Sequence, residues 1–408
     1  MSQPIQGRGR FVRLSLILVC LFNLASLNPA FCESPTPPAF SAGVPDQNTL
    51  DSRPDAVDVP SMSPELANAS LKAMIGQMII LGFPGTRPRQ EWPDRVAMMI
   101  RRGQIGGTIL FGSNVVDAVQ VKRLIRHLGK ANKGASPFVC IDQEGGAIQR
   151  LTAAKGFITT PSARDIAKMD HEAAYRLYQG MATQLATLGF NVNFGPVVDL
   201  DINPANPSIG RLARSYDRDA ETVASFAELF VNAHKQSGIM TVVKHFPGHG
   251  SAQDDPHTGI VNIEGTWQEQ ELIPFRHFVN ETSSMIMVGH LVHTRFSDGD
   301  RPASLSKQAI STELRSVLGF QGLVITDDLE MGAIRERYKI EEAAVLAISA
   351  GADLIVIANN ERPDTTVVER VTSAILQAIQ AGQIKESAVK RSHDRIVTAR
   401  LKLPRRAN

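Results

Sequence analysis

The residues best suited to chemistry lie in one short stretch. Residues 244–250 read KHFPGHG, and Asp255 and His257 follow shortly after. A carboxylate two residues before a histidine in a loop can hold one imidazole nitrogen. Such a partner raises the pKa of the histidine and fixes its orientation, as a general acid or base near neutral pH requires. The apolar residues 239–243 predict a buried strand leading into this stretch, where titratable groups kept for stability alone would be costly.

Two other interpretations of this stretch remain open. Three histidines and an aspartate are also a plausible set of metal ligands. Lys244 beside His245 argues against a metal, because a cation next to a metal ion is unfavourable. The histidines could also be ordinary structural residues with satisfied hydrogen bonds.

Further candidates follow other apolar runs. Asp327 comes directly after such a run, where a carboxylate could act as a nucleophile or stabilise positive charge. The alternative for Asp327 is the N-cap of a following helix, a role that suits Asp328 better. Asp142 ends another run, and Arg150 lies close enough in sequence to orient it. The alternative for these two residues is a structural ion pair under the loop.

The elements that must position these residues alternate along the chain. Eight short apolar runs are separated by longer segments with helical periodicity, such as 171–188, 220–236 and 306–318. This alternation predicts an α/β fold, a single (β/α)8 TIM-type barrel, closed by two C-terminal helices that break near Gly382. Polar residues that end at least five runs agree with a barrel, whose active site forms at the C-terminal ends of its strands. The runs are Met78–Leu81, Gly107–Phe111, Phe138–Ile141, Val192–Val198, Thr241–Val243, Met285–Val288, Leu323–Ile325 and Leu354–Ile357.

Composition and the N-terminus bound the setting. With 408 residues, 43% of them hydrophobic, and a net charge of +2, the chain suits a globular protein and gives no sign of a nucleic-acid partner. Arginines before the apolar residues 14–27 predict a signal peptide over 1–32, cleaved after Cys32. An uncleaved membrane anchor is the alternative, whereas Phe31 disfavours a lipid on Cys32. A Pro/Ser-rich linker over 33–63 should precede the barrel domain of 64–408, and we expect an exported protein, periplasmic or secreted.

Taken together, residues 65–400 resemble the family 3 glycoside hydrolases, most closely the bacterial β-N-acetylglucosaminidase branch. The resemblance rests on KHFPGHG with its following Asp-x-His, on TDDL at 326–329 and on DQEGG at 142–146. Two more blocks match, RSY at 214–216 and PASLS at 302–306.

The resemblance implies a role for each candidate. Asp327 would be the nucleophile, His257 the acid/base, and Asp255 its dyad partner. The terminal N-acetylglucosamine would be bound by Asp142, Arg150, Arg214, Lys244 and His245. The reaction would be retaining hydrolysis by a monomer without cofactor or metal, acting on carbohydrate from peptidoglycan fragments or chito-oligosaccharides, with no protein partner evident.

Two departures and several rivals accompany this prediction. Pro256 stands where the family usually has Ser, and Ala147 where an Arg often follows Glu-Gly-Gly. One rival is another glycosidase specificity, such as β-glucosidase, although those relatives usually take their acid/base from a second domain that this sequence does not show. The others are a phosphorylase, since a histidine would not repel incoming phosphate, and a barrel that binds sugar without turnover.

Overall fold

The computed structural model describes residues 64–129, 136–281 and 284–403. The chain divides into two units, 1–60 and 61–408, and all described residues lie in the second. The predicted signal peptide (1–32) and linker (33–63) lie outside the described residues. Within the described ranges, every helix is too short or too polar to cross a lipid bilayer.

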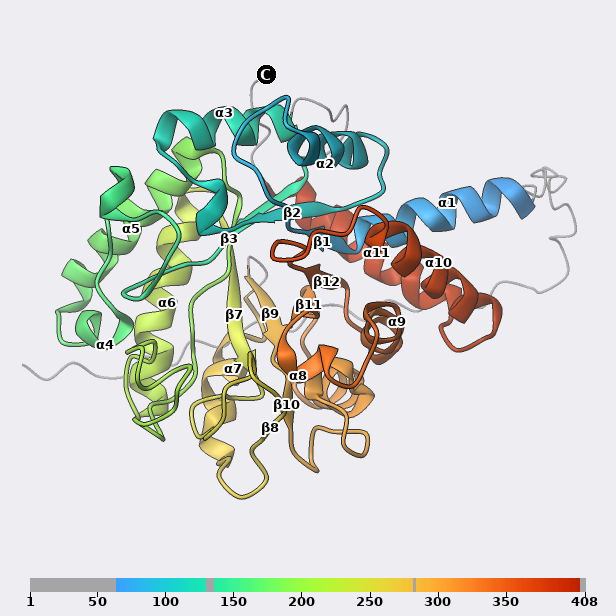
Figure 1. Cartoon of the computed structure of the whole chain (residues 1–408). Coiled ribbons are helices and arrows are strands. Elements are labelled where there is room, and N and C mark those ends of the chain that lie inside the picture. The colour runs from blue at the N-terminus through green and yellow to red at the C-terminus, as the bar shows by residue number, and fades with distance from the viewer. Residues whose placement is uncertain (1–63, 130–135, 282–283, 404–408) are drawn as a thin grey trace, which may run out of the picture. The chain divides into compact units, whose positions relative to one another are not determined.

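Eight parallel strands close into a barrel in the order β1, β12, β11, β9, β7, β6, β3, β2 (Figure 1). Each of these strands falls on one of the eight apolar runs, so the prediction of a (β/α)8 barrel is confirmed. The strands are β1 Ile79–Leu81, β2 Gly107–Leu110, β3 Phe138–Ile141, β6 Val192–Asn193, β7 Met240–Phe246, β9 Ser284–Val288, β11 Val324–Asp328 and β12 Leu354–Ile357.

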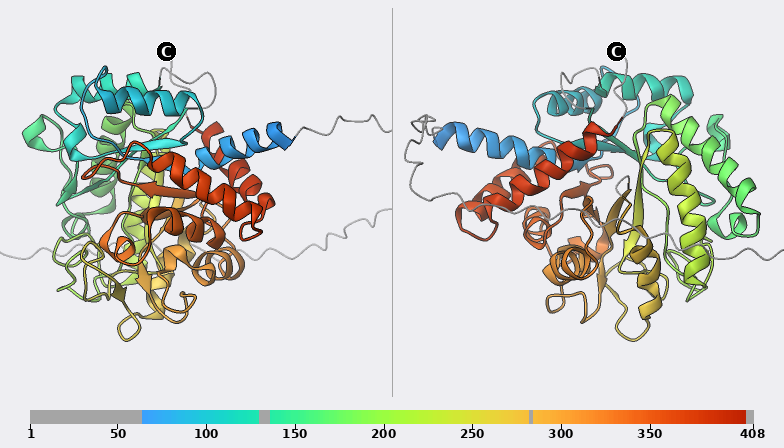
Figure 2. Two further views of the ribbon diagram at one scale, coloured as in Figure 1. Left: turned by 45° about the vertical axis from the view of Figure 1, so that its right-hand side comes forward. Right: turned by 180° about the vertical axis from the view of Figure 1, so that it is seen from behind.

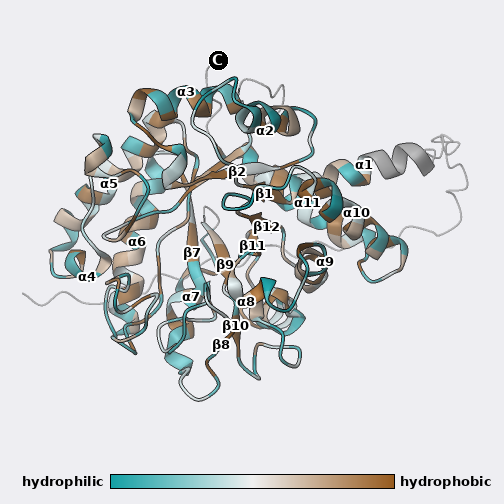
Figure 3. Cartoon of the chain, in the orientation of Figure 1, coloured by the Kyte–Doolittle hydropathy of each residue, from teal (hydrophilic) through white to brown (hydrophobic). Residues whose placement is uncertain are grey.

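The strands form because they are apolar along their whole length. Parallel strands covered by helices are buried on both faces, which favours continuous runs of branched apolar residues rather than alternation. Residues 354–357 read LIVI and are all buried, as are the four residues of β3. Figure 3 shows the strands mostly in the colours of hydrophobic residues, while the surrounding helices alternate between hydrophilic and hydrophobic residues.

Helices surround the barrel, as the further views in Figure 2 show. The two predicted helices α5 and α6 have the expected bounds and lie side by side. Their N-caps are Asp170 and Asp219, whose carboxylates accept hydrogen bonds from the backbone N–H groups of Ala173 and Thr222. The helices are α1 Pro64–Gln77, α2 Glu91–Arg101, α3 Ala118–Gly129, α4 Ala163–Ile166, α5 His171–Leu188, α6 Ala220–Gln236, α7 Ile273–Phe278, α8 Gly332–Arg335, α9 Ile340–Ala350, α10 Val367–Gln380 and α11 Glu386–Leu401.

The two predicted closing helices are α10 and α11. The turn between them contains Gly382, whose φ of 74° lies in the left-handed region that glycine adopts without strain. Helix α1 packs against both. The chain therefore closes the barrel with its first and last described helices in contact.

Three elements differ from the sequence prediction. The fourth strand, β6, ends at Asn193 rather than Val198. Beyond it, pairing with β7 continues only as an isolated bridge between Val197 and Lys244, and Pro196 in between offers no N–H to a strand ladder. β7 is longer than predicted and runs through Phe246, so Lys244 and His245 lie on the strand and not in the loop after it. The helical segment predicted at 306–318 is a π-helix over Gln308–Val317, with hydrogen bonds such as Leu318 N to the Glu313 carbonyl.

Two small sheets lie outside the barrel. A hairpin of β4 (Gln143–Gly145) and β5 (Ile148–Gln149) follows β3 directly, and β8 (Val261–Asn262) pairs with β10 (Leu291–Val292). The hairpin turns at Gly145 and Gly146, which both have positive φ. It thereby returns the chain so that Arg150 comes back beside Asp142.

Candidate active site

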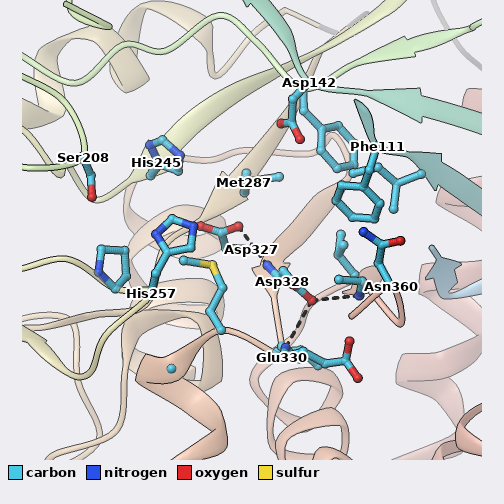
Figure 4. A pocket seen from close by; sticks show the side chains of 18 of the residues that line it. Phe111, Asp142, Ser208, His245, His257, Met287, Asp327, Asp328, Glu330 and Asn360 are labelled. Atoms are coloured by element: carbon cyan, nitrogen blue, oxygen red, sulfur yellow. Dashed lines mark hydrogen bonds between the residues drawn. The ribbon is translucent and has the colours of Figure 1, made fainter. Parts of the chain in front are cut away.

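A cavity of about 570 Å³ opens among the loops that follow the C-terminal ends of the barrel strands. Of the eight residues singled out from the sequence, all but Asp255 line this cavity. Figure 4 shows Asp327 near its centre, with His257, His245 and Asp142 on the surrounding walls. The structure therefore brings together the residues predicted from five separate segments: Asp142, Arg150, Arg214, Lys244, His245, His257 and Asp327.

One wall of the cavity is a cluster of three cations and two carboxylates, buried at Lys244 and Glu144 and partly exposed at Arg150. Lys244 Nζ lies 3.0 Å from Asp142 Oδ1 and 2.7 Å from Glu144 Oε1. Arg150 donates to Asp142 at 3.1 Å, and Arg214 makes a bidentate pair with Glu144, with two contacts of 2.8 Å. Because every charge in the cluster has a partner, the cluster can be buried without an isolated ion.

The partners in this cluster determine its protonation. Burial would raise the pKa of Glu144, but Arg214 and Lys244 together lower it to about 2. Burial would lower the pKa of Lys244, yet Glu144 and Asp142 raise it overall. The pKa of Asp142 is lowered too, since Lys244 and Arg150 outweigh the effect of burial. All three groups are thus charged at neutral pH.

Glu144 was not among the predicted site residues. It lies on β4 within the DQEGG block, between the predicted Asp142 and the glycine turn. A count of charges could have found it, because three cations beside a single carboxylate in one cavity wall would leave two of them unpaired.

A second structural pair joins His245 to Asp199. Asp199 is fully buried and its Oδ2 lies 2.7 Å from His245 Nδ1. Its other oxygen accepts the backbone N–H groups of His245 (3.2 Å) and His249 (2.8 Å). Burial would raise the pKa of Asp199, but His245 lowers it overall, so an ionised carboxylate holds both histidines of KHFPGHG. In the sequence Asp199 is one of the polar residues that directly follow an apolar run.

Asp327 and Asp328 end β11 with different surroundings. Asp327 Oδ1 accepts the N–H of Asp328 at 2.8 Å, and no other side-chain hydrogen bond ties its carboxylate among the described residues. Burial would raise the pKa of Asp327, but His290 and His245, together with this hydrogen bond, lower it overall. An ionised carboxylate therefore faces the cavity.

Asp328 braces the chain behind it. Its Oδ1 accepts the N–H groups of Glu330 (3.1 Å) and Ala358 (2.9 Å), and burial raises its pKa to about 7. The expectation that Asp328 caps a helix is wrong, since the next helix, α8, starts at Gly332 with Met331 as its N-cap. The reason is a turn between β11 and α8, which Asp328 closes by binding Glu330 two residues later.

His290 supports the same segment from below. Its Nε2 lies 2.8 Å from the Asp328 carbonyl oxygen and its Nδ1 2.7 Å from Ser304 Oγ. Because a carbonyl only accepts, Nε2 carries the hydrogen and Nδ1 accepts from the serine hydroxyl. Burial lowers the pKa of His290. Ser304 belongs to the PASLS block, so this part of the sequence lies behind Asp327.

His257 and Asp255 form the predicted pair. Their Nδ1–Oδ1 distance is 2.7 Å, and Asp255 Oδ1 also accepts the backbone N–H of His257 at 3.0 Å. Partial burial would raise the pKa of Asp255, but the hydrogen bonds from His257 lower it overall. The imidazole is 69% exposed. With Nδ1 bound to Asp255, Nε2 is left for the cavity, where Figure 4 shows the ring beside Asp327.

The three histidines do not converge as metal ligands would. His245 is bound to Asp199 and His257 to Asp255, while both ring nitrogens of buried His249 lack a partner in the described structure. Burial lowers the pKa of His249 to about 4, so its ring is neutral. Across residues 64–129, 136–281 and 284–403, no group of three or more His, Cys, Asp or Glu side chains is arranged to hold a metal ion.

The family follows from the sequence as a whole. Residues 70–399 match the model described as glycosyl hydrolase family 3 N terminal domain. The chain belongs to glycosyl hydrolase family 3. The family predicted from the motifs is confirmed, and the match covers nearly all of the described residues of this family 3 protein.

Similar proteins agree with this assignment. The chain is 31% identical to a β-hexosaminidase A from Pseudoalteromonas piscicida over 81% of its own length, and 33% identical to β-hexosaminidase LpqI from Mycobacterium tuberculosis over 85%. A solved family 3 β-N-acetylglucosaminidase from Paenibacillus sp. str. FPU-7 aligns with 81% of the chain at 33% identity and a TM-score of 0.74. The chain spans 61% of the Pseudoalteromonas protein, 87% of LpqI and 62% of the Paenibacillus chain.

Proposed function

We propose that this family 3 protein is a retaining β-N-acetylhexosaminidase that removes terminal, non-reducing β-linked N-acetylglucosamine residues. The observation that carries the proposal is the pairing of two groups in one cavity: an ionised carboxylate, Asp327, and an imidazole, His257, held by Asp255. Retaining glycosidases need a nucleophile and a proton donor beside the same glycosidic bond. The names of the similar proteins support the choice of sugar.

In the first step Asp327 attacks the anomeric carbon and forms a glycosyl ester. The protonated ring of His257 keeps its Nδ1–H, which donates to Asp255, and gives its Nε2 proton to the glycosidic oxygen, which leaves as an alcohol. The low pKa of Asp327 suits this step, because the nucleophile is ionised while the nearby imidazole is the donor.

In the second step the neutral Nε2 accepts a proton from water as that water attacks the same carbon. The ester bond breaks, Asp327 recovers its charge, and two inversions give retention. Asp255 stays ionised throughout and holds Nδ1, so that the imidazole keeps one orientation in both directions of proton transfer.

The wall of paired charges is proposed to bind the sugar hydroxyls and the N-acetyl group. Asp142 can accept from hydroxyls, while Arg150, Arg214 and Lys244 can donate, and their mutual pairs hold them in place. His245 presents Nε2 to the cavity because Asp199 holds Nδ1. This arrangement supports a site for one neutral sugar ring, bound by oriented polar groups.

We further propose the setting of the reaction. The arginine-flanked apolar segment of the N-terminus supports export, and exposed N-acetylglucosamine ends on peptidoglycan fragments or chito-oligosaccharides are accessible substrates there. We also propose that the protein acts as a monomer without a protein partner. Mass measurement of the mature protein and its sedimentation test both points.

The direct test compares aryl β-glycosides of N-acetylglucosamine and of glucose, with and without a chelator. Turnover of the N-acetyl sugar, unaffected by the chelator, is the expected result. Asp327→Ala should abolish it. Turnover of the glucoside alone would assign another specificity. Loss of activity on chelation that zinc restores would support the alternative in which the histidines bind a metal ion.

Two outcomes separate the remaining rivals. Faster cleavage in phosphate buffer, with a sugar phosphate as product, would make the protein a phosphorylase. Binding of N-acetylglucosamine by the wild type without turnover of any glycoside would leave a sugar-binding barrel.

A further inference from the structure

The exposed imidazole of His257 lies on a turn that is tied together by its own hydrogen bonds. The carbonyl of Asp255 accepts hydrogen bonds from the backbone N–H (3.0 Å) and hydroxyl (2.9 Å) of Thr258, and the Asp255 side chain binds His257. Residues 255–258 therefore form one compact unit, which we call the dyad turn. Its internal hydrogen bonds fix its shape but not its position in the protein.

One side of the dyad turn is held by Ser208. The Ser208 hydroxyl lies 3.3 Å from Asp255 Oδ1, and the Ser208 carbonyl accepts from Arg214 at 2.9 Å. The Ser208 N–H in turn donates to Asn206. The loop that supplies Arg214 to the charged wall of the cavity thus also contacts the Asp255 carboxylate, which orients His257.

The opposite side is held by the start of α8. The N–H of Ala333 donates to the Pro256 carbonyl at 2.9 Å. First-turn N–H groups of a helix have no partner within the helix, so the dyad turn supplies one that α8 lacks. The contact is close: a Cβ added to Gly332 would lie 2.3 Å from the His257 carbonyl oxygen and 2.8 Å from its carbon.

α8 is also attached to the other half of the site. Met331, its N-cap, donates its N–H to the Asp328 carbonyl at 3.1 Å, and Asp328 adjoins Asp327. Residues 327–333 therefore connect the carboxylate in the cavity to the surface that the dyad turn touches. Burial cannot position His257, because its side chain is largely exposed, whereas these contacts can.

On this geometry we propose that Gly332 and Ser208 are positioning residues, which hold the dyad turn so that His257 Nε2 faces the anomeric carbon above Asp327. The inference rests on the proposed function, in which His257 is the acid/base. Gly332 acts by having no side chain, since only hydrogen lets the His257 backbone approach α8. Ser208 acts through its hydrogen bond to Asp255.

The test is Gly332→Ala in the full chain, measured on two substrates with different leaving groups. Gly332 has no left-handed φ, so its backbone tolerates alanine and the strain of the substitution falls on the contact between α8 and the segment that carries His257. A displaced acid matters for a poor leaving group and little for an activated one. We expect kcat/KM for the disaccharide N,N′-diacetylchitobiose to fall at least about tenfold. For the dinitrophenyl glycoside, kcat and KM should fall together and leave kcat/KM within about twofold of wild type.

Two companion variants guard this test. Gly265→Ala is the matched control, because an added Cβ there meets no heavy atom within 4 Å, and it should behave as wild type. Ser208→Ala removes the hydrogen bond to Asp255 without adding bulk, and should show the same leaving-group dependence as Gly332→Ala, in smaller measure. It keeps the inference testable if Gly332→Ala does not fold.

The outcomes separate the two levels of the proposal. Suppose that kcat/KM of His257→Ala depends on the leaving group, while kcat/KM of Gly332→Ala and Ser208→Ala falls equally for both substrates or for neither. The positioning inference is then wrong and the acid/base assignment stands. If His257→Ala itself shows no such dependence, the proposed function fails first. The double variant Gly332→Ala/His257→Ala should be no slower than His257→Ala alone, because a residue that acts through His257 has nothing left to position.

Discussion

Replacing Asp199 by asparagine should weaken both the fold and the site. The amide oxygen can still accept the two backbone N–H groups that Asp199 Oδ1 binds. The amide nitrogen, however, would face His245 Nδ1, where the carboxylate now lies at 2.7 Å. Asparagine would donate to Nδ1, so the neutral ring would carry its hydrogen on Nε2 instead. The nitrogen facing the cavity would change from an acceptor to a donor.

The magnitude follows from the three hydrogen bonds. A bond to a charged group contributes about 1.5–3 kcal/mol and one between neutral groups about 1 kcal/mol. Exchanging three hydrogen bonds to a charged carboxylate for three to a neutral amide gives a loss of about 2–4 kcal/mol in the free energy of unfolding. For a domain larger than 200 residues this corresponds to a fall of roughly 4–8 °C in Tm. The changed His245 should lower kcat/KM by about 10- to 100-fold.

The assay is thermal unfolding together with the kinetics of an aryl N-acetylglucosaminide. Asp201→Asn is the control, since that carboxylate lies two residues away and pairs with the more exposed Arg164 at 2.8 Å. A pair of this kind contributes about 0–1 kcal/mol. If Asp199→Asn has the same Tm as Asp201→Asn and wild-type kinetics, the view that the Asp199 carboxylate holds the histidines is refuted.

Three further predictions concern the surrounding charges. Burial raises the pKa of Asp328 to about 7, so its ionisation costs stability as pH rises from about 4 to 7. Asp328→Asn keeps both Oδ1 hydrogen bonds and should be about 2–4 kcal/mol more stable than wild type at pH 8. At pH 4 the two proteins should be equally stable in urea unfolding. Glu144, with a pKa of about 2, contributes stability above about pH 4.5 that is lost as pH falls toward 2. Between these pH values the unfolding free energy of Glu144→Gln should therefore change by about 3 kcal/mol less than that of wild type. If both proteins lose the same free energy over this range, the pairing of Glu144 is contradicted. Ser304→Ala removes the donor to His290 Nδ1 and should cost about 1–2 kcal/mol of unfolding free energy, whereas a neutral result would mean that the ring does not depend on the hydroxyl.

The barrel could be predicted from the sequence because its strands are buried on both faces. Runs such as Phe138–Ile141 and Leu354–Ile357 are apolar throughout, which separates them from the amphipathic helices between them. The helix caps at Asp170 and Asp219 also follow local rules. The end of β6 was predicted too late in the sequence because the strand ends before Pro196. A proline interrupts a strand only where its missing N–H would have bonded a neighbouring strand, and the sequence does not show which strands are neighbours.

The site could be predicted as a set of residues but not as a set of pairs. Asp255 and His257 are two residues apart, and their hydrogen bond follows from that spacing. By contrast, Glu144 meets Arg214, and Asp199 meets His245, only because the barrel brings distant segments to one end. The same holds for Ala333 and Pro256, whose contact depends on how two loops descend from different strands.

The contact between α8 and the dyad turn limits where this protein can change in length. Loops at the top of a barrel normally tolerate insertions, which is how one scaffold acquires many specificities. Between Asp327 and Ala333 an added residue would rotate the Ala333 N–H away from Pro256 and bring a side chain against the His257 carbonyl, which now packs on Gly332. Insertions, whether from natural variation or from engineering, should therefore occur in other connections, while the segment from Asp327 to Ala333 keeps its seven residues.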